Sequence, residues 1–246
     1  MGAKQRVDRQ PAYVLHAYPW RETSLIVEAF TPDHGRVALV AKGARRPTSA
    51  LRGVLMAFQP LLMDWSGGGE VKTLVRAEWQ GGQPLLSGRA LLCGYYLNEL
   101  LVKLSAREDP HPALFGAYAE TLARLASESV FAPLLRRFEL ALLRELGYGL
   151  ELDHDAATGA PVEPAGRYLY IIEKGPIATG EMVSSAADVG ETVQLSGQTL
   201  LDMVEARFDR SETLSQSKGL LRMLINHYLN GKPLESRRVL KELQEL

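Results

Sequence analysis

The chain has 246 residues, of which 46% are hydrophobic, and its formal net charge is −1 at pH 7. This composition is typical of a soluble protein with a sizeable core, and it excludes a disordered chain. A single cysteine, Cys93, excludes an internal disulfide and a cysteine-rich metal site, which favours a reducing compartment. Since no apolar run has the length of a signal peptide or a membrane span, we expect a cytoplasmic protein without membrane segments.

Five short segments in the first eighty or so residues alternate in strand fashion, and turn sequences separate them. Residues 31–35 (TPDHG) and 66–69 (SGGG) are rich in the residue types that turns favour. The expected strands span residues 13–20, 24–31, 36–43, 58–65 and 70–79. Five short strands with a longer excursion after the third favour a small closed barrel, most simply an OB-fold. We therefore expect an OB-fold β-barrel over residues 1–82.

Positive charge is concentrated around the excursion of this barrel. Residues 1–89 contain 12 Lys and Arg against 7 Asp and Glu, whereas the remainder contains 16 against 22. Between Gly35 and Met63 there is no carboxylate at all. The cations of this segment are Arg36, Lys42, Arg45, Arg46 and Arg52. Gly43 and Pro47 favour a loop here. Such asymmetry also arises by chance, but it is typical of a surface that binds a polyanion.

The apolar period becomes helical after about Pro84. Helices are predicted over residues 85–104, 111–127, 130–148, 196–208, 211–230 and 234–246. Residues 150–195 lose this period, and within them residues 167–182 are typical of a small hairpin with a Gly-Pro corner. We therefore expect an α+β chain in two parts: the barrel, then a mainly helical domain over residues 83–246 that contains the cysteine-less hairpin region.

Catalytic motifs are weak in this sequence. Residues 215–218 fit Ser-x-x-Lys, but the companion motifs of penicillin-interacting enzymes are missing. Residues 67–73 (GGGEVKT) are similar to a phosphate loop, yet they lead into a strand and not into a helix. The histidines are dispersed, and residues 153–155 (DHD) form only a weak candidate for a metal site. We therefore expect no enzyme, no cofactor and no bound metal.

Nucleic-acid binding is the function that the barrel favours. Single-stranded nucleic acid needs cations for its phosphates and flat rings for its bases. The phosphate contacts are expected on Lys42, Arg45 and Arg46. Trp20, Phe58 and Trp65 lie near the ends of expected strands. These rings either stack on bases or belong to the core, and the sequence leaves both interpretations open.

A second binding feature is the helix expected over residues 130–148. Its apolar face consists of Phe131, Leu134, Leu135, Phe138, Leu142 and Leu146. Arg137 and Arg144 flank this face, and Arg136 points further round. The pattern fits an ordinary core helix. It also fits a pocket for an acidic peptide that ends in an aromatic residue, in which arginine holds a carboxylate and the apolar face holds the ring.

Several motifs follow one another in a specific order along the chain. They are WRETSL, VAKGAR, GEVKTL, RRFEL and GKPLESR. In this combination, from about Tyr13 to Arg238, the chain resembles the RecO family of bacterial DNA repair and recombination mediators. The resemblance implies an N-terminal OB-fold and a helical C-terminal domain. It also implies binding of single- and double-stranded DNA without sequence preference, annealing of complementary strands, and no reaction on a covalent bond.

The resemblance further implies partners and site residues. Proteins of this family act with RecR to help RecA load on DNA coated by the single-stranded DNA-binding protein, SSB, in the cytoplasm at the nucleoid. By position, the DNA-binding residues would be Arg36, Lys42, Arg45, Arg46, Arg52 and Lys72. The pocket for the acidic SSB tail would involve Arg136, Arg137, Phe138 and Leu142.

The chain departs from the family pattern in one region. Many members carry two cysteine pairs that form a zinc site after the GYG motif, but residues 150–182 contain no cysteine here. A thiolate zinc site is therefore impossible, and we expect packing alone to hold the hairpin. The alternative function is that of an OB-fold factor that acts on RNA, which would explain the barrel but not the large helical domain.

Overall fold

The computed structural model describes residues 6–148, 150–179 and 191–244, with side chains as far as Val239. The chain divides into two compact units, residues 1–129 with 234–246 and residues 130–233. The helices of residues 88–127 and 235–244 belong to the same compact unit as the barrel. The domain boundary expected between residues 82 and 83 stays a prediction. No helix among the described residues is long and apolar enough to cross a lipid bilayer.

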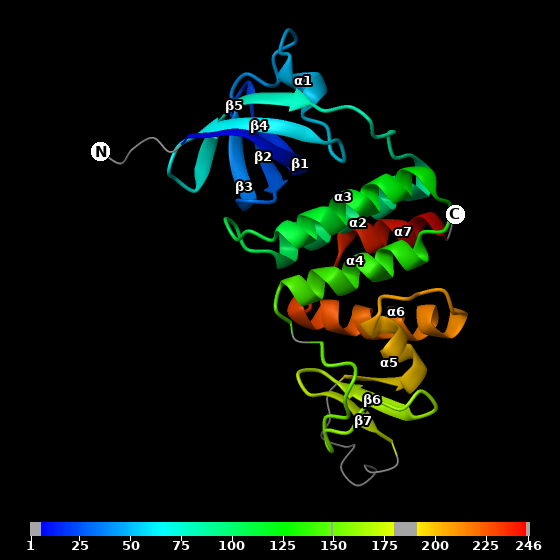
Figure 1. Ribbon diagram of the computed structural model, residues 1–246. Helices are drawn as coiled ribbons and strands as arrows, with labels where there is room; N and C mark the ends of the chain where they lie inside the picture. The colour runs from blue at the N-terminus through cyan, green and yellow to red at the C-terminus, as the bar shows by residue number, and fades with distance from the viewer. Residues whose placement is uncertain (1–5, 149, 180–190, 245–246) are drawn as a thin grey trace. The chain divides into compact units, whose positions relative to one another are not determined.

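Five strands form the closed barrel that the alternating pattern predicts, so the expected α+β, OB-like fold is confirmed (Figure 1). The strands are β1 (Arg6–Trp20), β2 (Ser24–Thr31), β3 (Gly35–Ala41), β4 (Leu61–Ser66) and β5 (Val71–Trp79). Their order around the barrel is β1-β2-β3-β5-β4. β1 is longer than expected because its first half pairs with β4 and its second half with β2. A short parallel pairing of β3 with β5, residues 38–40 with 71–73, closes the barrel.

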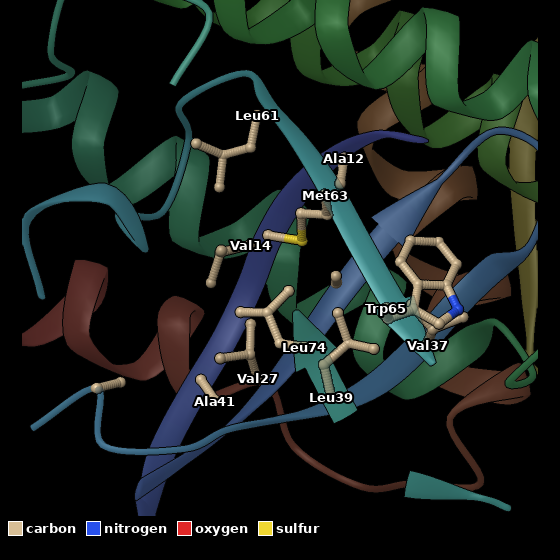
Figure 2. Packing of buried hydrophobic residues seen from close by; sticks show 12 residues of the cluster. Ala12, Val14, Val27, Val37, Leu39, Ala41, Leu61, Met63, Trp65 and Leu74 are labelled. Carbon is tan, nitrogen blue, oxygen red and sulfur yellow. The ribbon is translucent and has the colours of Figure 1, made fainter. Parts of the chain in front are cut away.

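The barrel interior is filled by alternate residues of the strands, because successive side chains of a strand point to opposite faces. Figure 2 shows Val27, Leu39, Met63 and Leu74 turned toward one another, with Trp65 to one side beside Val37. Leu39 and Met63 are fully buried, and Trp65 is 1% exposed. Burial of this apolar cluster stabilises the barrel as a rigid platform for whatever its outer face binds.

Three long helices of the described residues belong to the first unit: α2 (Gly88–Leu104), α3 (Pro112–Ser127) and α7 (Glu235–Gln244). Helix α3 packs on the barrel through Tyr118, whose ring lies 5.2 Å from the ring of Tyr13 and 6.0 Å from that of Phe30. Helix α7 begins against α2, where the Glu99 carboxylate accepts hydrogen bonds from the backbone and the hydroxyl of Ser236. Tyr118 thus fixes α3 to the barrel, and Glu99 fixes α7 to α2.

Among its described residues, the second unit contains three helices and a small sheet. Its helices are α4 (Ala132–Glu145), α5 (Gly197–Val204) and α6 (Ser211–Tyr228), and α6 packs against the other two. The sheet has the order β7-β6-β8, with β6 (Arg167–Ile171), β7 (Gly175–Ala178) and β8 (Thr192–Ser196). The predicted hairpin is thus present as β6 and β7, although its expected end at 180–182 lies outside the described residues. The pattern did not predict β8.

A buried carboxylate organises the cysteine-less loop that precedes β6. Asp155 is 4% exposed. Its Oδ1 accepts hydrogen bonds from the backbone of Ala157 and Thr158, and its Oδ2 accepts one from the backbone of Ala178 in β7. Burial alone would raise the pKa of Asp155, but these hydrogen bonds outweigh it and the pKa lies below its usual value. Asp155 thus ties the loop to the hairpin without a thiolate, so the expectation that packing alone holds the hairpin is wrong.

We expect Asp155→Asn to lower the free energy of unfolding by about 1–3 kcal/mol, because an amide nitrogen at Oδ2 would face the Ala178 amide, donor against donor. Since the pKa of Asp155 is depressed in the folded state, the stability that it supplies is present above the unfolded pKa, near about 4, and is lost as the pH falls through the folded pKa. Urea unfolding at pH 7 and below pH 4 measures both effects. Asp153→Asn, at an exposed neighbour, is the control; equal stability of the two variants would contradict the role of Asp155.

Candidate nucleic-acid interface

A loop after β3 carries most of the predicted DNA-binding cations. Gly43 adopts φ +69°, a left-handed conformation that glycine tolerates best, and Ala44 is 1% exposed, which anchors the loop in the core. The backbone N–H of Arg45 donates to the Thr23 carbonyl oxygen at 2.9 Å, and that of Arg46 donates to Gly43 at 3.0 Å. The loop ends in a single helical turn, α1 (Leu51–Val54), which the pattern did not predict.

Four cations of this loop are exposed to solvent: Lys42, Arg45, Arg46 and Arg52. The guanidinium of Arg45 donates weakly to the carbonyl oxygens of Arg21 and Glu22 in the β1–β2 turn, at 3.4 and 3.2 Å. In the part of the chain that the structure describes, no ion pair joins any of the four to a carboxylate. Their charge is therefore not neutralised within the first unit, and each side chain has donors available for a phosphate.

Two other predicted DNA-binding residues lie in ion pairs. Arg36 is partly buried, and its guanidinium donates to the Glu28 carboxylate and to the Ser105 carbonyl oxygen, both at 2.9 Å. Lys72 is 8% exposed and pairs with Glu108. These contacts hold the loop between α2 and α3 against the barrel. Either side chain would have to leave its carboxylate to reach a phosphate.

Arg107 is a further cation beside these pairs, and no pattern in the sequence pointed to it. Its guanidinium pairs with the second oxygen of the Glu28 carboxylate, and the side chain remains 41% exposed. The hydrogen bond from Arg107 to Glu28 raises the pKa of Arg107. The Glu28 carboxylate thus pairs with Arg36 through one oxygen and with Arg107 through the other. The pairing spans 79 positions of sequence, so only a contact map would have revealed it.

The residues predicted for the partner pocket lie on α4, but most are covered. Phe138 and Leu142 are 1% and 0% exposed, and Arg136, 8% exposed, pairs with the fully buried Glu139 at 2.6 Å. Arg137 is partly exposed, and its Nε donates to the Ala206 carbonyl oxygen just after α5. On the same helix, Arg144 donates to the carbonyl oxygens of Met203 and Val204 at the end of α5. Two arginines of α4 therefore satisfy carbonyl groups at and just after the end of α5.

The three aromatic residues with two open interpretations separate into core and surface. Trp65 is 1% exposed in the barrel interior, and Phe58 is 4% exposed and packs edge-on against Tyr95 at 5.1 Å. The core interpretation is confirmed for these two. Trp20 is 44% exposed at the end of β1, so its ring remains accessible to a ligand.

Comparison with known proteins places this chain among relatives of one kind. Residues 6–82 match the family model described as "Recombination protein O N terminal", and residues 85–238 match "Recombination protein O C terminal". A protein of Aromatoleum aromaticum is 70% identical over 246 residues, the whole of both chains, and one of Azoarcus sp. (strain BH72) is 67% identical over the same length. A third, of Dechloromonas aromatica, is 55% identical over 251 residues, again the whole of both chains.

All three relatives are named "DNA repair protein RecO". Two adjoining family models cover nearly the full chain, and the identities are far above what a shared fold alone would produce. The resemblance of the sequence motifs is therefore confirmed over both domains: the chain belongs to the RecO family.

Proposed function

We propose that this chain is a DNA repair and recombination mediator that binds single- and double-stranded DNA and anneals complementary strands. With RecR, it promotes the loading of RecA on single-stranded DNA coated by SSB, in the cytoplasm and without catalysis of a covalent step. Membership of the RecO family and the name shared by its relatives support a role in DNA repair. The basic loop of the barrel supports DNA as the ligand.

The observation that carries this proposal is the set of exposed cations Lys42, Arg45, Arg46 and Arg52 in a segment without carboxylates. Lysine and arginine that neutralise phosphates release condensed counterions, and this contribution does not depend on base sequence. Two strands that share one cationic surface repel each other less, which favours annealing. Arg36 and Lys72 have a supporting role in this proposal, because they hold the surface in place.

We place the contact with the acidic SSB tail on the second unit, at α4. Of the four predicted residues, Arg137 is the partly exposed one and can meet a carboxylate of the tail. Arg136, Phe138 and Leu142 hold α4 in the unit from within. A tail that is tethered to coated DNA raises the effective concentration of the protein there, without any new contact to DNA.

The test is annealing of two complementary strands coated with intact SSB or with SSB that lacks its acidic tail. Because the tail supplies effective concentration, we expect annealing to be about 10- to 100-fold faster with intact SSB. Release of a quenched fluorophore pair follows the rate, and naked strands provide the reference. Equal rates with both SSB forms would contradict the tail contact and leave DNA binding as a separate question.

A competition with RNA in the same assay separates the alternative function. Phosphate contacts alone do not distinguish the two polymers, but an RNA-binding factor must read the 2′-hydroxyl groups. A strong preference for RNA of the same sequence would favour the alternative of an RNA-binding factor over the proposed role in recombination.

A further inference from the structure

The outer face of the barrel carries a row of rings beside the basic loop. Ala17 pairs with Val27 of the core and packs against that core. Since side chains of a strand alternate between faces, the neighbours of Ala17 and the next alternate residue lie on the outer face. These residues are His16, Tyr18 and Trp20. The rings of His16 and Tyr18 lie 5.9 Å apart and 32° from parallel, as expected of neighbours on one face.

The rings at the end of this row are open to solvent. Tyr18 is 38% exposed and Trp20 is 44% exposed. On the preceding part of β1, by contrast, Tyr13 is 6% exposed because α3 covers it. Packing within the first unit therefore accounts for the ring of Tyr13 but not for those of Tyr18 and Trp20. Large exposed rings in a group are typical of a binding surface.

The strand register continues the row from Tyr18 across the sheet. Tyr18 pairs with Ile26 of β2, Ile26 pairs with Val40 of β3, and Val40 pairs with Thr73 of β5. The row crosses four strands on the outer face, since the residues next to it in the strands, Val27 and Leu39, belong to the core. Ile26 is 5% exposed, whereas Val40 and Thr73 are partly exposed, so only the latter two residues of this row can contact a base.

Cations border the row of rings. Lys42 follows β3 directly, and the hairpin turn that begins after Trp20 is tied to the basic loop by the backbone and the guanidinium of Arg45. At the other end of the row Arg107 pairs with Glu28, the register partner of His16. The Glu28 carboxylate is therefore neutralised by Arg107 and Arg36 and does not repel a phosphate.

We propose that the bases of single-stranded DNA stack on Trp20 and Tyr18, while the phosphates next to these bases bind Lys42, Arg45 and Arg46. This inference rests on the proposed function and adds the contact that distinguishes single strands from duplex. In a duplex the faces of each base are already covered by the neighbouring bases, so only the phosphates remain for binding to the protein. Stacking leaves the base edges free, and a strand held in this way can still pair with its complement.

The first test compares an oligothymidine with an abasic strand of equal length, which has the phosphates without the bases. We expect the full chain to bind the oligothymidine at least about 30-fold more tightly, because stacking on an aromatic side chain contributes about 1–3 kcal/mol for each base and two rings are available. Tyr18→Ala/Trp20→Ala should lose this preference and keep its affinity for the abasic strand. Trp79→Ala, at an exposed tryptophan of the same barrel, should behave as the unmodified chain.

Tryptophan fluorescence provides the second readout. The chain has three tryptophans, and Trp65 is shielded in the core. In a Trp79→Phe background, an oligothymidine should therefore quench Trp20, whereas the abasic strand should not. When Trp20→Phe is added to the Trp79→Phe background, the quenching should disappear. The affinity for the oligothymidine should stay within about threefold of that of Trp79→Phe, because phenylalanine retains a ring for stacking. Retained affinity also shows that the variant is folded.

The possible failures are distinguishable. If both strands bind equally, with salt-dependent affinity and no quenching, stacking on Trp20 and Tyr18 is overturned while the phosphate contacts of the proposed function stand. If quenching persists in Trp20→Phe, the bases meet another tryptophan and the assignment is overturned. If neither strand binds, the inference and the proposed function fail together.

Discussion

Arg36→Ala is expected to lower the free energy of unfolding by about 3 kcal/mol and to leave the salt dependence of DNA binding nearly unchanged. Arg36 donates to the Glu28 carboxylate and to the Ser105 carbonyl oxygen, and the Glu28 side chain is only 5% exposed. Removal of the guanidinium leaves Arg107 as the remaining partner of Glu28. It also removes the hydrogen bond to Ser105 that holds the α2–α3 loop against the barrel. Urea unfolding and a salt titration of DNA affinity measure the two expectations.

Arg46→Ala is the matched control, since it removes the same charge from an exposed position of the same barrel. It should change stability by less than about 0.5 kcal/mol, as surface substitutions usually do, and it should flatten the salt dependence. If instead Arg36→Ala leaves stability intact and flattens the salt dependence as Arg46→Ala does, Arg36 contacts phosphate directly and its ion pair is incidental.

The second large effect is expected from Lys42→Ala/Arg45→Ala/Arg46→Ala. The triple variant should bind single-stranded DNA of every sequence more weakly, by about 20-fold or more at low salt, because three phosphate contacts are lost at once. Stability should change little, since all three side chains are exposed. A different effect on one base sequence than on another would show that these residues read bases and not phosphates.

Much of the fold could be predicted from apolar periodicity, because periodicity is a local property. The alternation in SLIVEAFT gave β2 at Ser24–Thr31, and the helical spacing of residues 111–127 matches α3 at Pro112–Ser127. Long-range pairing was not visible in the same way. The first half of β1 reads as polar and irregular, and it is a strand because β4 pairs with it. Strand β8 likewise depends on its pairing with β6.

The candidate site shows the same limit. In the sequence, Arg36 and Lys42 are equivalent members of one cationic segment. The structure separates them, because Glu28 and the Ser105 carbonyl reach Arg36 from other parts of the chain, whereas Lys42 stays exposed. Charge counts therefore grouped these cations but could not say which of them are already paired. The two interpretations of Trp20 were equally undecidable, since exposure is set by which helices cover the sheet.

The central claim is that the exposed loop of the barrel binds the DNA phosphates. The salt dependence of the affinity for single-stranded DNA tests this claim most directly. The slope of log affinity against log salt concentration should be shallower by about 2 in Lys42→Ala/Arg45→Ala/Arg46→Ala than in the unmodified chain, since each phosphate contact on a single strand contributes about 0.7. A control that removes three exposed cations of the second unit, Lys174→Ala/Lys218→Ala/Arg222→Ala, should keep the original slope. An unchanged slope in the loop variant, with a shallower slope in the control, would place the DNA on the second unit and contradict the account.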